Sequence, residues 1–394
     1  MHGDVMNAPQ PAPESTFAPT PRRKNLIFKI LLAIALLVLI IPIALQGLAG
    51  FSPVVDVRDK VSSLGGTIQT TVAAPEFLQS IVGKDWEGWK RFYGGVEVGR
   101  VSLNQSLVED EDLVLLQQTP GLRTLGLRAT RITDAGMQQL AGVPQLQKLD
   151  LGGTEITNAG LDHLQPLEDL QELVIAETTV SDDGVAKLAG LKTLTVLDAS
   201  GTKLTDASLK TISEIPNLKT LKLDRCKLTD EGLAVLKNCQ SLTSLSLDGI
   251  PLTGSFLKEL KGVPIEDLSL ANTKCDGTAF SDAGELKTLS LNHCPVEEAG
   301  IASIAAIPSL ETLSLDNTKI AERSIAGLRG MPHLRILSIN STPTSADTLR
   351  ELRDMPSLKL VIANKTQVSR GDVDALGAEI KSFSVLIVSS GGGG

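Results

Sequence analysis

The chain has 394 residues and a formal net charge of -9, with 37 Lys and Arg against 46 Asp and Glu. Nucleic-acid binding draws much of its affinity from Lys and Arg side chains that neutralise phosphates. Because acidic residues outnumber basic ones in this chain, we predict no nucleic-acid partner. An acidic surface keeps a domain soluble and favours basic partners or cations.

The first 25 residues have few apolar side chains and many prolines. Pro9, Pro11, Pro13 and Pro19 stand among Ala, Ser and Thr. Such a segment buries too little apolar surface to offset the entropy lost on folding. We therefore expect residues 1–25 to form a disordered tail, which the next segment places in the cytoplasm.

Residues 26–49 contain a long apolar run, Ile30 to Leu45, close to the ~20 residues that a membrane-spanning helix needs. We predict a single-pass transmembrane helix that acts as a signal anchor. The basic segment Arg22-Arg23-Lys24 precedes it, so the positive-inside rule places the N-terminus in the cytoplasm and the rest outside, in the periplasm or at the cell surface. The alternative is a cleaved signal peptide, for which Gly47-Leu48-Ala49 offers small residues. Either interpretation exports the residues that follow.

Residues 50–95 are predicted to be a linker and an N-terminal cap. Helical spacing of apolar residues predicts a helix over Pro53–Leu64 that ends at Gly65-Gly66, and a second helix over Pro75–Val82. Four aromatic side chains follow at 86–93 (Trp86, Trp89, Phe92 and Tyr93). We expect them to cover the first apolar layer of the domain that begins next. An aromatic ligand site and an interfacial belt are alternatives.

From residue 96 to residue 388 one pattern returns about every 24 residues. It reads Leu-x-x-Leu-x-Leu, two variable residues, Thr or Cys, then Ile/Leu-Thr-Asp-x-Gly-Leu-x-x-Leu. A fixed period of this length is typical of a solenoid of stacked coils. About twelve coils begin at Val98, Leu122, Leu146, Leu170, Leu194, Leu218, Leu242, Ile265, Leu286, Leu310, Leu334 and Leu358.

Each coil contains one predicted strand and one predicted short helix. The alternation Leu310-x-x-Leu313-x-Leu315 is strand spacing with one buried face, and Thr229-Asp230 is a helix N-cap before apolar residues at helical spacing. The predicted fold is an α/β right-handed superhelix, with a parallel sheet on the concave face and helices on the convex face.

A small hydroxyl or thiol side chain stands eight places after most coil starts. It can hydrogen-bond the backbone where the strand turns away, so we assign this column a structural role. The column consists of Ser106, Thr130, Thr154, Thr178, Thr202, Cys226, Ile250, Thr273, Cys294, Thr318, Thr342 and Thr366.

In its repeat pattern and its Thr/Cys column, the chain resembles the cysteine-containing, ribonuclease-inhibitor-like class of leucine-rich repeats. It is also similar to membrane-anchored exported leucine-rich repeat proteins of planctomycete-type bacteria. In eukaryotes this repeat class includes F-box substrate receptors, but no room for an F-box precedes the first coil. The resemblance implies a binding surface and supplies no catalytic residue.

The outward side chains of the concave face are small and polar, without the aromatic and Arg anchors that dominate many interfaces. We expect polar, wet contacts with a protein partner at this face. The candidate binding residues are Asp150, Asp198, Lys222, Asp224, Ser246, Asp248, Ser269, Ser290, Asn292, His293, Ser314, Asp316, Ser338 and Asn340.

Ser290, His293 and Asp316 are the residue types of a catalytic triad. On a flat sheet exposed to water they would lack an oxyanion hole and a substrate pocket, so we predict no catalysis. We expect acids such as Asp224 and Asp248 to be solvated charges rather than calcium ligands. No metal and no cofactor is predicted.

Four cysteines occur, without zinc-site spacing. Cys226 and Cys294 occupy one column three coils apart, which is too far for a disulfide. Cys275 and Cys294 lie in adjacent coils and form the one candidate disulfide; otherwise the thiols are expected to be buried.

The coil at 265–285 is three residues short and carries Asp276-Gly277 where other coils have Thr-Asp. Ordinary repeat decay and a local binding feature are both open interpretations. Residues 389–394 end in four glycines and are predicted to be a flexible tail.

These observations predict a non-enzymatic protein-interaction module, displayed outside the cytoplasmic membrane by a single-pass anchor. The first alternative is a structural scaffold of the cell envelope that associates with copies of itself. An F-box-like adaptor is a second alternative, and an enzyme is the least favoured.

Overall fold

The computed structural model describes residues 53–72, 96–119, 121–380 and 382–387. The predicted tail at 1–25, span at 26–49, helix at 75–82, aromatic cluster at 86–93 and glycine tail at 389–394 lie outside these ranges. Among the helices within them, none is long and apolar enough to cross a membrane. The chain divides into two compact units, and almost all described residues belong to the unit Pro53–Thr71 with Glu97–Gly394.

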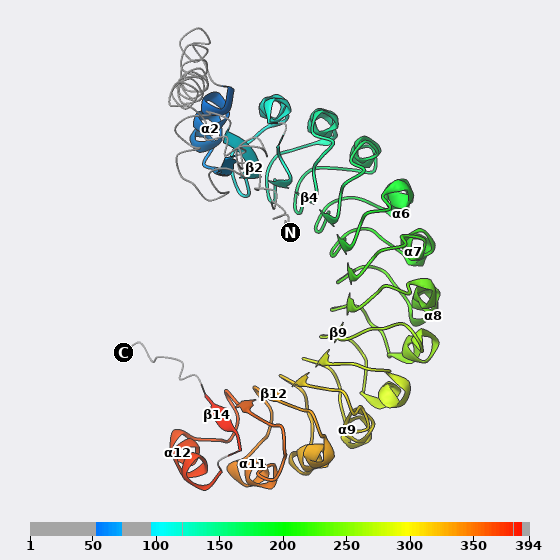
Figure 1. The fold of residues 1–394 in the computed structure, drawn as a ribbon. Helices are drawn as coiled ribbons and strands as arrows, with labels where there is room; N and C mark the ends of the chain where they lie inside the picture. Colours follow the sequence, from blue (N-terminus) through cyan, green and yellow to red (C-terminus); the bar gives the residue numbers. More distant parts are fainter. Residues whose placement is uncertain (1–52, 73–95, 120, 381, 388–394) are drawn as a thin grey trace, which may run out of the picture. The chain divides into compact units, whose positions relative to one another are not determined.

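One sheet of fourteen strands runs through this unit in sequence order. The strands line its inner side and the helices its outer side (Figure 1). Strands β2 to β13 correspond to the twelve predicted coils, and β2 to β14 run parallel. The strands are β1 (Thr67–Val72), β2 (Val96–Ser102), β3 (Thr124–Gly126), β4 (Lys148–Asp150), β5 (Glu172–Val174), β6 (Val196–Asp198), β7 (Thr220–Lys222), β8 (Ser244–Ser246), β9 (Asp267–Ser269), β10 (Thr288–Ser290), β11 (Thr312–Ser314), β12 (Ile336–Ser338), β13 (Leu360–Ile362) and β14 (Ser384–Leu386).

The alternation of the repeat produces one buried face on this sheet. Leu310, Leu313 and Leu315 are all fully buried, while Thr312 and Ser314 between them point away from the core. Leu313 lies opposite Leu289 in the neighbouring strand, so the leucines form continuous apolar rows across the coils. The predicted strand pattern is therefore confirmed.

The hydroxyl column has the structural role predicted for it. Thr154 Oγ1 donates to the Leu151 carbonyl at 2.6 Å, and Thr318 Oγ1 donates to the Leu315 carbonyl at 2.6 Å. The residue just before this column has a positive φ in every coil, which reverses the chain after the strand. These left-handed positions are Gln105, Ala129, Gly153, Glu177, Gly201, Arg225, Gly249, Asn272, His293, Asn317, Ser341 and Lys365.

The helical part of a coil is usually a single α turn, a 3-10 helix (η), or one followed by the other. The predicted N-capping is present at Thr229, whose Oγ1 accepts from the Gly232 amide at 3.1 Å. The helices are α2 (Pro53–Ser63), η1 (Asp110–Gln118), α5 (Asp134–Met137), η2 (Gln138–Gly142), η3 (Gly160–Leu164), α6 (Asp182–Val185), η4 (Ala186–Gly190), α7 (Asp206–Ser213), α8 (Asp230–Leu233), η5 (Ala234–Asn238), η6 (Ser255–Leu260), η7 (Thr278–Asp282), α9 (Glu298–Ala305), α10 (Glu322–Ile325), η8 (Ala326–Gly330), α11 (Ala346–Glu351) and α12 (Arg370–Glu379).

The Thr-Asp-x-Gly motif also joins one coil to the next. Thr229 donates from its amide and its hydroxyl to the two carboxylate oxygens of Asp206 in the preceding coil, at 2.9 and 2.6 Å. A Cβ at Gly232 would lie 2.1 Å from Asp206 Cγ, so only glycine leaves room for this carboxylate. We call this repeated contact the threonine–aspartate ladder. It runs from Asp110 to Thr253, with Asn158 and Ser181 in the same roles at one step, and stops there because Gly254 stands where the aspartate would be. Farther along, Glu322 accepts from the Ser345 amide in an equivalent contact.

The helix predicted before the first coil is present as α2. Val57 and Val61 are buried, and the chain leaves the helix at Gly65, whose φ of +82° suits glycine. Lys60 Nζ lies 2.8 Å from Asp112 Oδ1, which ties α2 to the helical turn of the first coil.

The short coil keeps its place in the sheet. Ser269 of β9 lies opposite Ser246 and Ser290, so the register is uninterrupted. The shortening is absorbed on the outer side, where Gly277, with a φ of +88°, packs directly against Gly300 of α9.

Candidate interaction surface

The predicted binding residues lie on the inner strands or just after them, and neighbouring coils bring them into columns. Asp198 lies opposite Lys222, and Lys222 lies opposite Ser246. Most of these side chains are half-buried, whereas Lys222 and His293 are exposed.

Many of the predicted residues hydrogen-bond to one another across the coils. Asp224 Oδ1 accepts from Ser246 Oγ at 2.6 Å and from the Asp248 amide at 2.9 Å. Asp248 Oδ1 accepts in the same way from Ser269 Oγ at 2.6 Å and from the Ala271 amide at 2.8 Å. We call this arrangement the serine–aspartate ladder.

The ladder continues beyond the short coil with asparagine in the same role. Asn292 Oδ1 accepts from Ser314 Oγ at 2.7 Å, and Asp316 Oδ1 accepts from Ser338 Oγ at 2.7 Å. Ala271 offers no such acceptor, so the ladder is interrupted before Ser290. The predicted polar strip is therefore largely an internal hydrogen-bond system that fastens coil to coil.

Replacing Asp248 with Asn tests the ladder and its charge together. Asn292 shows that an amide oxygen accepts the same two hydrogen bonds. Burial raises the pKa of Asp248, and the nearby Asp224 raises it too, against hydrogen bonds from Ser269 and Ala271 that lower it. An acid whose pKa is raised in the folded state lowers stability while it is ionised, at pH values above that pKa. As pH falls, the folded state takes up the proton and this loss of stability is recovered.

We therefore expect Asp248→Asn to have a higher free energy of unfolding than the wild type at pH 7. The difference should shrink as pH falls through the raised pKa toward the ordinary value of about 3.9. Urea unfolding of both proteins at pH 7, 5 and 4 measures it. Asp248→Ala, which loses the acceptor, should be less stable than either. A destabilised Asp248→Asn, or a difference that does not change with pH, would contradict this account.

The residue types of the triad are not assembled. His293 lies in the turn after β10 with a φ of +61° and is exposed. Asp316 Oδ1 accepts from Ser338 Oγ and from the Asn340 amide, and its Oδ2 accepts from Asn340 Nδ2. The acid is thus engaged by the following coil instead of orienting an imidazole.

The buried thiols do not offer a nucleophile either. All four cysteines are buried and free, so the candidate pairing of Cys275 with Cys294 is absent. Cys294 Sγ instead donates to the Leu270 carbonyl at 3.0 Å. Burial raises the pKa of Cys239 to about 11 and that of Cys275 to about 12, which leaves both thiols protonated at neutral pH. In the described part of the chain, no three His, Cys, Asp or Glu residues are grouped as a metal site.

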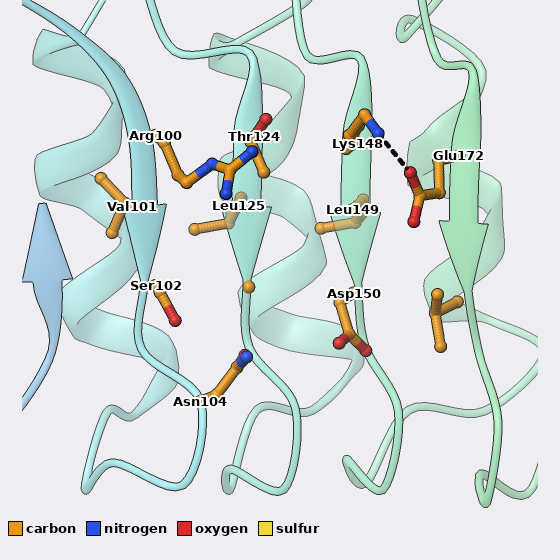
Figure 2. A pocket seen from close by; sticks show the side chains of 12 residues that line it. Arg100, Val101, Ser102, Asn104, Thr124, Leu125, Lys148, Leu149, Asp150 and Glu172 are labelled. Atoms are coloured by element: carbon orange, nitrogen blue, oxygen red, sulfur yellow. Dashed lines mark hydrogen bonds and ion pairs between the residues drawn. The ribbon is translucent and has the colours of Figure 1, made fainter. Parts of the chain in front are cut away.

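The sequence interpretation missed a hollow over the first strands of the concave face. It is open to solvent, has a volume of about 270 Å³ and spans β2 to β5 (Figure 2). Its outward residues include a column two places after each coil start, which the sequence analysis did not consider: Arg100, Thr124, Lys148 and Glu172. Gly126 has no side chain here, and Ser102 has a small one, which leaves the space open.

The hollow combines both signs of charge. Lys148 Nζ lies 2.7 Å from Glu172 Oε2, with Lys148 exposed and Glu172 half-buried at the surface, so this pair adds little stability. Burial raises the pKa of Asp150, while an amide hydrogen bond from Gly152 and the charge of Arg128 lower it. These charged groups remain available to a partner, unlike the side chains of the serine–aspartate ladder.

Comparisons with known proteins agree with this architecture. A family model described as a leucine-rich repeat matches residues 214–237. An internalin from Listeria monocytogenes is similar in structure, with 20% identity, a TM-score of 0.54, and coverage of 79% of this chain and 89% of that chain. Internalin C2 of the same organism has 20% identity and a TM-score of 0.34, over 59% and 78% of the two chains.

A plant peptide hormone receptor has 17% identity and a TM-score of 0.43, over 72% of this chain and 45% of that chain. No curated protein matches the chain. At this identity the likeness to the first internalin shows the fold alone. The repeat pattern, the sheet of stacked coils and the matched repeat together show a leucine-rich repeat protein.

Proposed function

We propose that the chain is a non-enzymatic interaction module that contacts a protein partner at the hollow over β2 to β5. The observation that carries this proposal is a contrast within the concave face. In the later coils the serines and acids are engaged in the serine–aspartate ladder. In the hollow, the exposed Lys148 pairs with the half-buried Glu172 beside the small residues Ser102 and Gly126. Paired charges at the surface of this kind set partner choice and orientation.

A photo-crosslinking residue tests this placement in the full chain. Placed at Thr124 in the hollow, it should crosslink to one discrete partner protein, whereas at Thr312 on β11 it should not. Lys148→Glu should abolish the crosslink, because it removes the positive charge of the pair and places a like charge beside Glu172. Lys237→Glu, an exposed lysine on the outer side, is the matched control and should leave it unchanged. Equal crosslinking at 124 and 312 would contradict the proposal, and products made only of this chain would favour the self-associating scaffold.

We also propose that the module is displayed outside the cytoplasmic membrane by the segment 26–49. The apolar run Ile30 to Leu45 and the basic residues before it support this topology. The full chain should then stay in the membrane fraction after alkaline extraction, and protease added outside the membrane should digest the repeats. Release by alkali would favour the cleaved signal peptide, and protection from protease would contradict export.

A further inference from the structure

The concave face changes character in its last strands. In most earlier coils the outward residues of the strands are polar or charged, such as Thr288 and Ser290 of β10. In β12 to β14, four of the six equivalent positions hold Ile336, Leu360, Ile362 and Leu386, and Ser338 and Ser384 hold the other two. We call these four side chains the apolar patch. Contiguous exposed apolar surface in a soluble domain is a marker of an interaction site.

The register of the sheet joins the four residues into one surface. Ile336 lies opposite Leu360, and Ile362 lies opposite Leu386. Leu360 and Ile362 are two places apart on β13, so they point to the same side. Leu386 is 45% exposed, and the other three side chains are half-buried. Side chains directly opposite one another in a sheet are close enough to contact a common ligand residue.

β14 also lies at the end of the sheet. The strand order ends with β14, so within the described residues its outer edge has no neighbouring strand. An unpaired edge can add an extended segment of another chain through backbone hydrogen bonds. The apolar patch therefore adjoins an edge that can hold a peptide in a strand conformation.

Positive charge surrounds the apolar patch. Lys359 directly precedes β13 and Lys365 follows it in the left-handed turn, and both are exposed. Arg335 lies beside Lys359, because the Lys359 amide donates to the Arg335 carbonyl. Glu311 partly balances Arg335, at 3.5 Å. In a chain with a net charge of -9, this is a local reversal of sign.

We infer that the apolar patch binds an extended segment of a partner protein in which apolar residues alternate with acidic ones. Alternation in a strand places the apolar side chains on the patch and leaves the acidic ones near Lys359 and Lys365. A second copy of this chain fits less well, because a symmetric contact through the same patch would bring these lysines against themselves. This site is separate from the hollow over β2 to β5.

Fluorescence anisotropy with the full chain tests the inference. The probe is a labelled ten-residue peptide, four Leu-Glu repeats between serines, with matched probes that carry Lys for Glu or Ser for Leu. We expect only the Leu-Glu probe to bind, with weaker affinity at high salt. Leu386→Ser and Ile362→Ser should each weaken binding at least tenfold. Lys359→Glu combined with Lys365→Glu should weaken it at least fivefold.

Matched variants elsewhere on the face separate this site from the rest. Val196→Ser, a half-buried outward residue of β6, and Lys222→Glu on β7 should leave the affinity unchanged. Lys148→Glu should also leave the affinity for the probe unchanged. Failure of the proposal for the hollow and failure of the inference for the apolar patch would therefore give different results. Equal binding of the Lys probe, or wild-type affinity in Leu386→Ser, would overturn the inference. The inference would also be overturned if light scattering showed a dimer that dissociates in Leu386→Ser while the probe does not bind.

Discussion

A Gly300→Ala variant is expected to unfold at a much lower denaturant concentration than the wild type. Its Cβ would lie 2.1 Å from the Asp276 carbonyl oxygen and 3.0 Å from Gly277 Cα. Both neighbours are backbone atoms of the short coil, so no side chain can rotate to make room. Overpacking of this kind costs about 1–3 kcal/mol and occasionally more, and the backbone contact places this variant at or above about 3 kcal/mol.

Gly330→Ala is the matched control for this prediction. Gly330 also lies in a helical turn, at the end of η8, and nothing lies within 4 Å of a Cβ built there. Urea unfolding followed by circular dichroism should show Gly330→Ala close to the wild type. A Gly300→Ala protein within about 0.5 kcal/mol of the wild type would mean that the two coils can separate at no cost, contrary to the packing described.

A Phe280→Ala variant should lower the free energy of unfolding by about 3–5 kcal/mol. Phe280 is 1% exposed and lies in the short coil, where it occupies the place that Leu236 and Leu260 hold in two longer coils. We expect the larger ring to compensate for the three missing residues. Phe280→Leu should therefore also destabilise, although leucine is the usual residue of the repeat.

The reciprocal substitution checks this explanation. Leu236 is fully buried in a coil of ordinary length, so Leu236→Phe should overpack the core and destabilise by about 1–3 kcal/mol. Thermal and urea unfolding of the three variants give the comparison. If Leu236→Phe is tolerated and Phe280→Leu is neutral, the ring does not compensate for the shortened coil.

The stacked coils could be predicted from the sequence, because the apolar residues recur regularly both from coil to coil and within each strand. The 24-residue period located β2 to β13, and the alternation within Leu310-x-x-Leu313 identified the buried side of a strand. The helix at Pro53–Ser63 was predicted from apolar spacing and a terminal glycine pair. The structural role of the Thr column was also confirmed, by the bond from Thr154 to the Leu151 carbonyl.

The candidate surface was harder to predict, since it depends on contacts between coils. Ser246 and Asp224 are 22 residues apart, and their hydrogen bond exists because the coils stack. The hollow was missed because Arg100 and Lys148 belong to an outward column that was not considered. The signal was available, since side chains two places after a coil start also point outward.

The apolar patch was missed for a different reason. The candidate binding residues were chosen among polar side chains, so the apolar Ile362 and Leu386 were not among them. Only the register of β13 with β14 brings these two side chains together.

The short coil has a mechanical consequence. The threonine–aspartate ladder stops after Thr253, and the serine–aspartate ladder is interrupted at Ala271. Neither ladder therefore connects the short coil to the coil that follows it. Tension applied to the two ends of the repeats would load the interfaces between coils in series. At the interface between the short coil and the next, that load would fall on the packing of Gly277 against Gly300 and on the hydrogen bond from Cys294 Sγ to the Leu270 carbonyl, and not on either ladder.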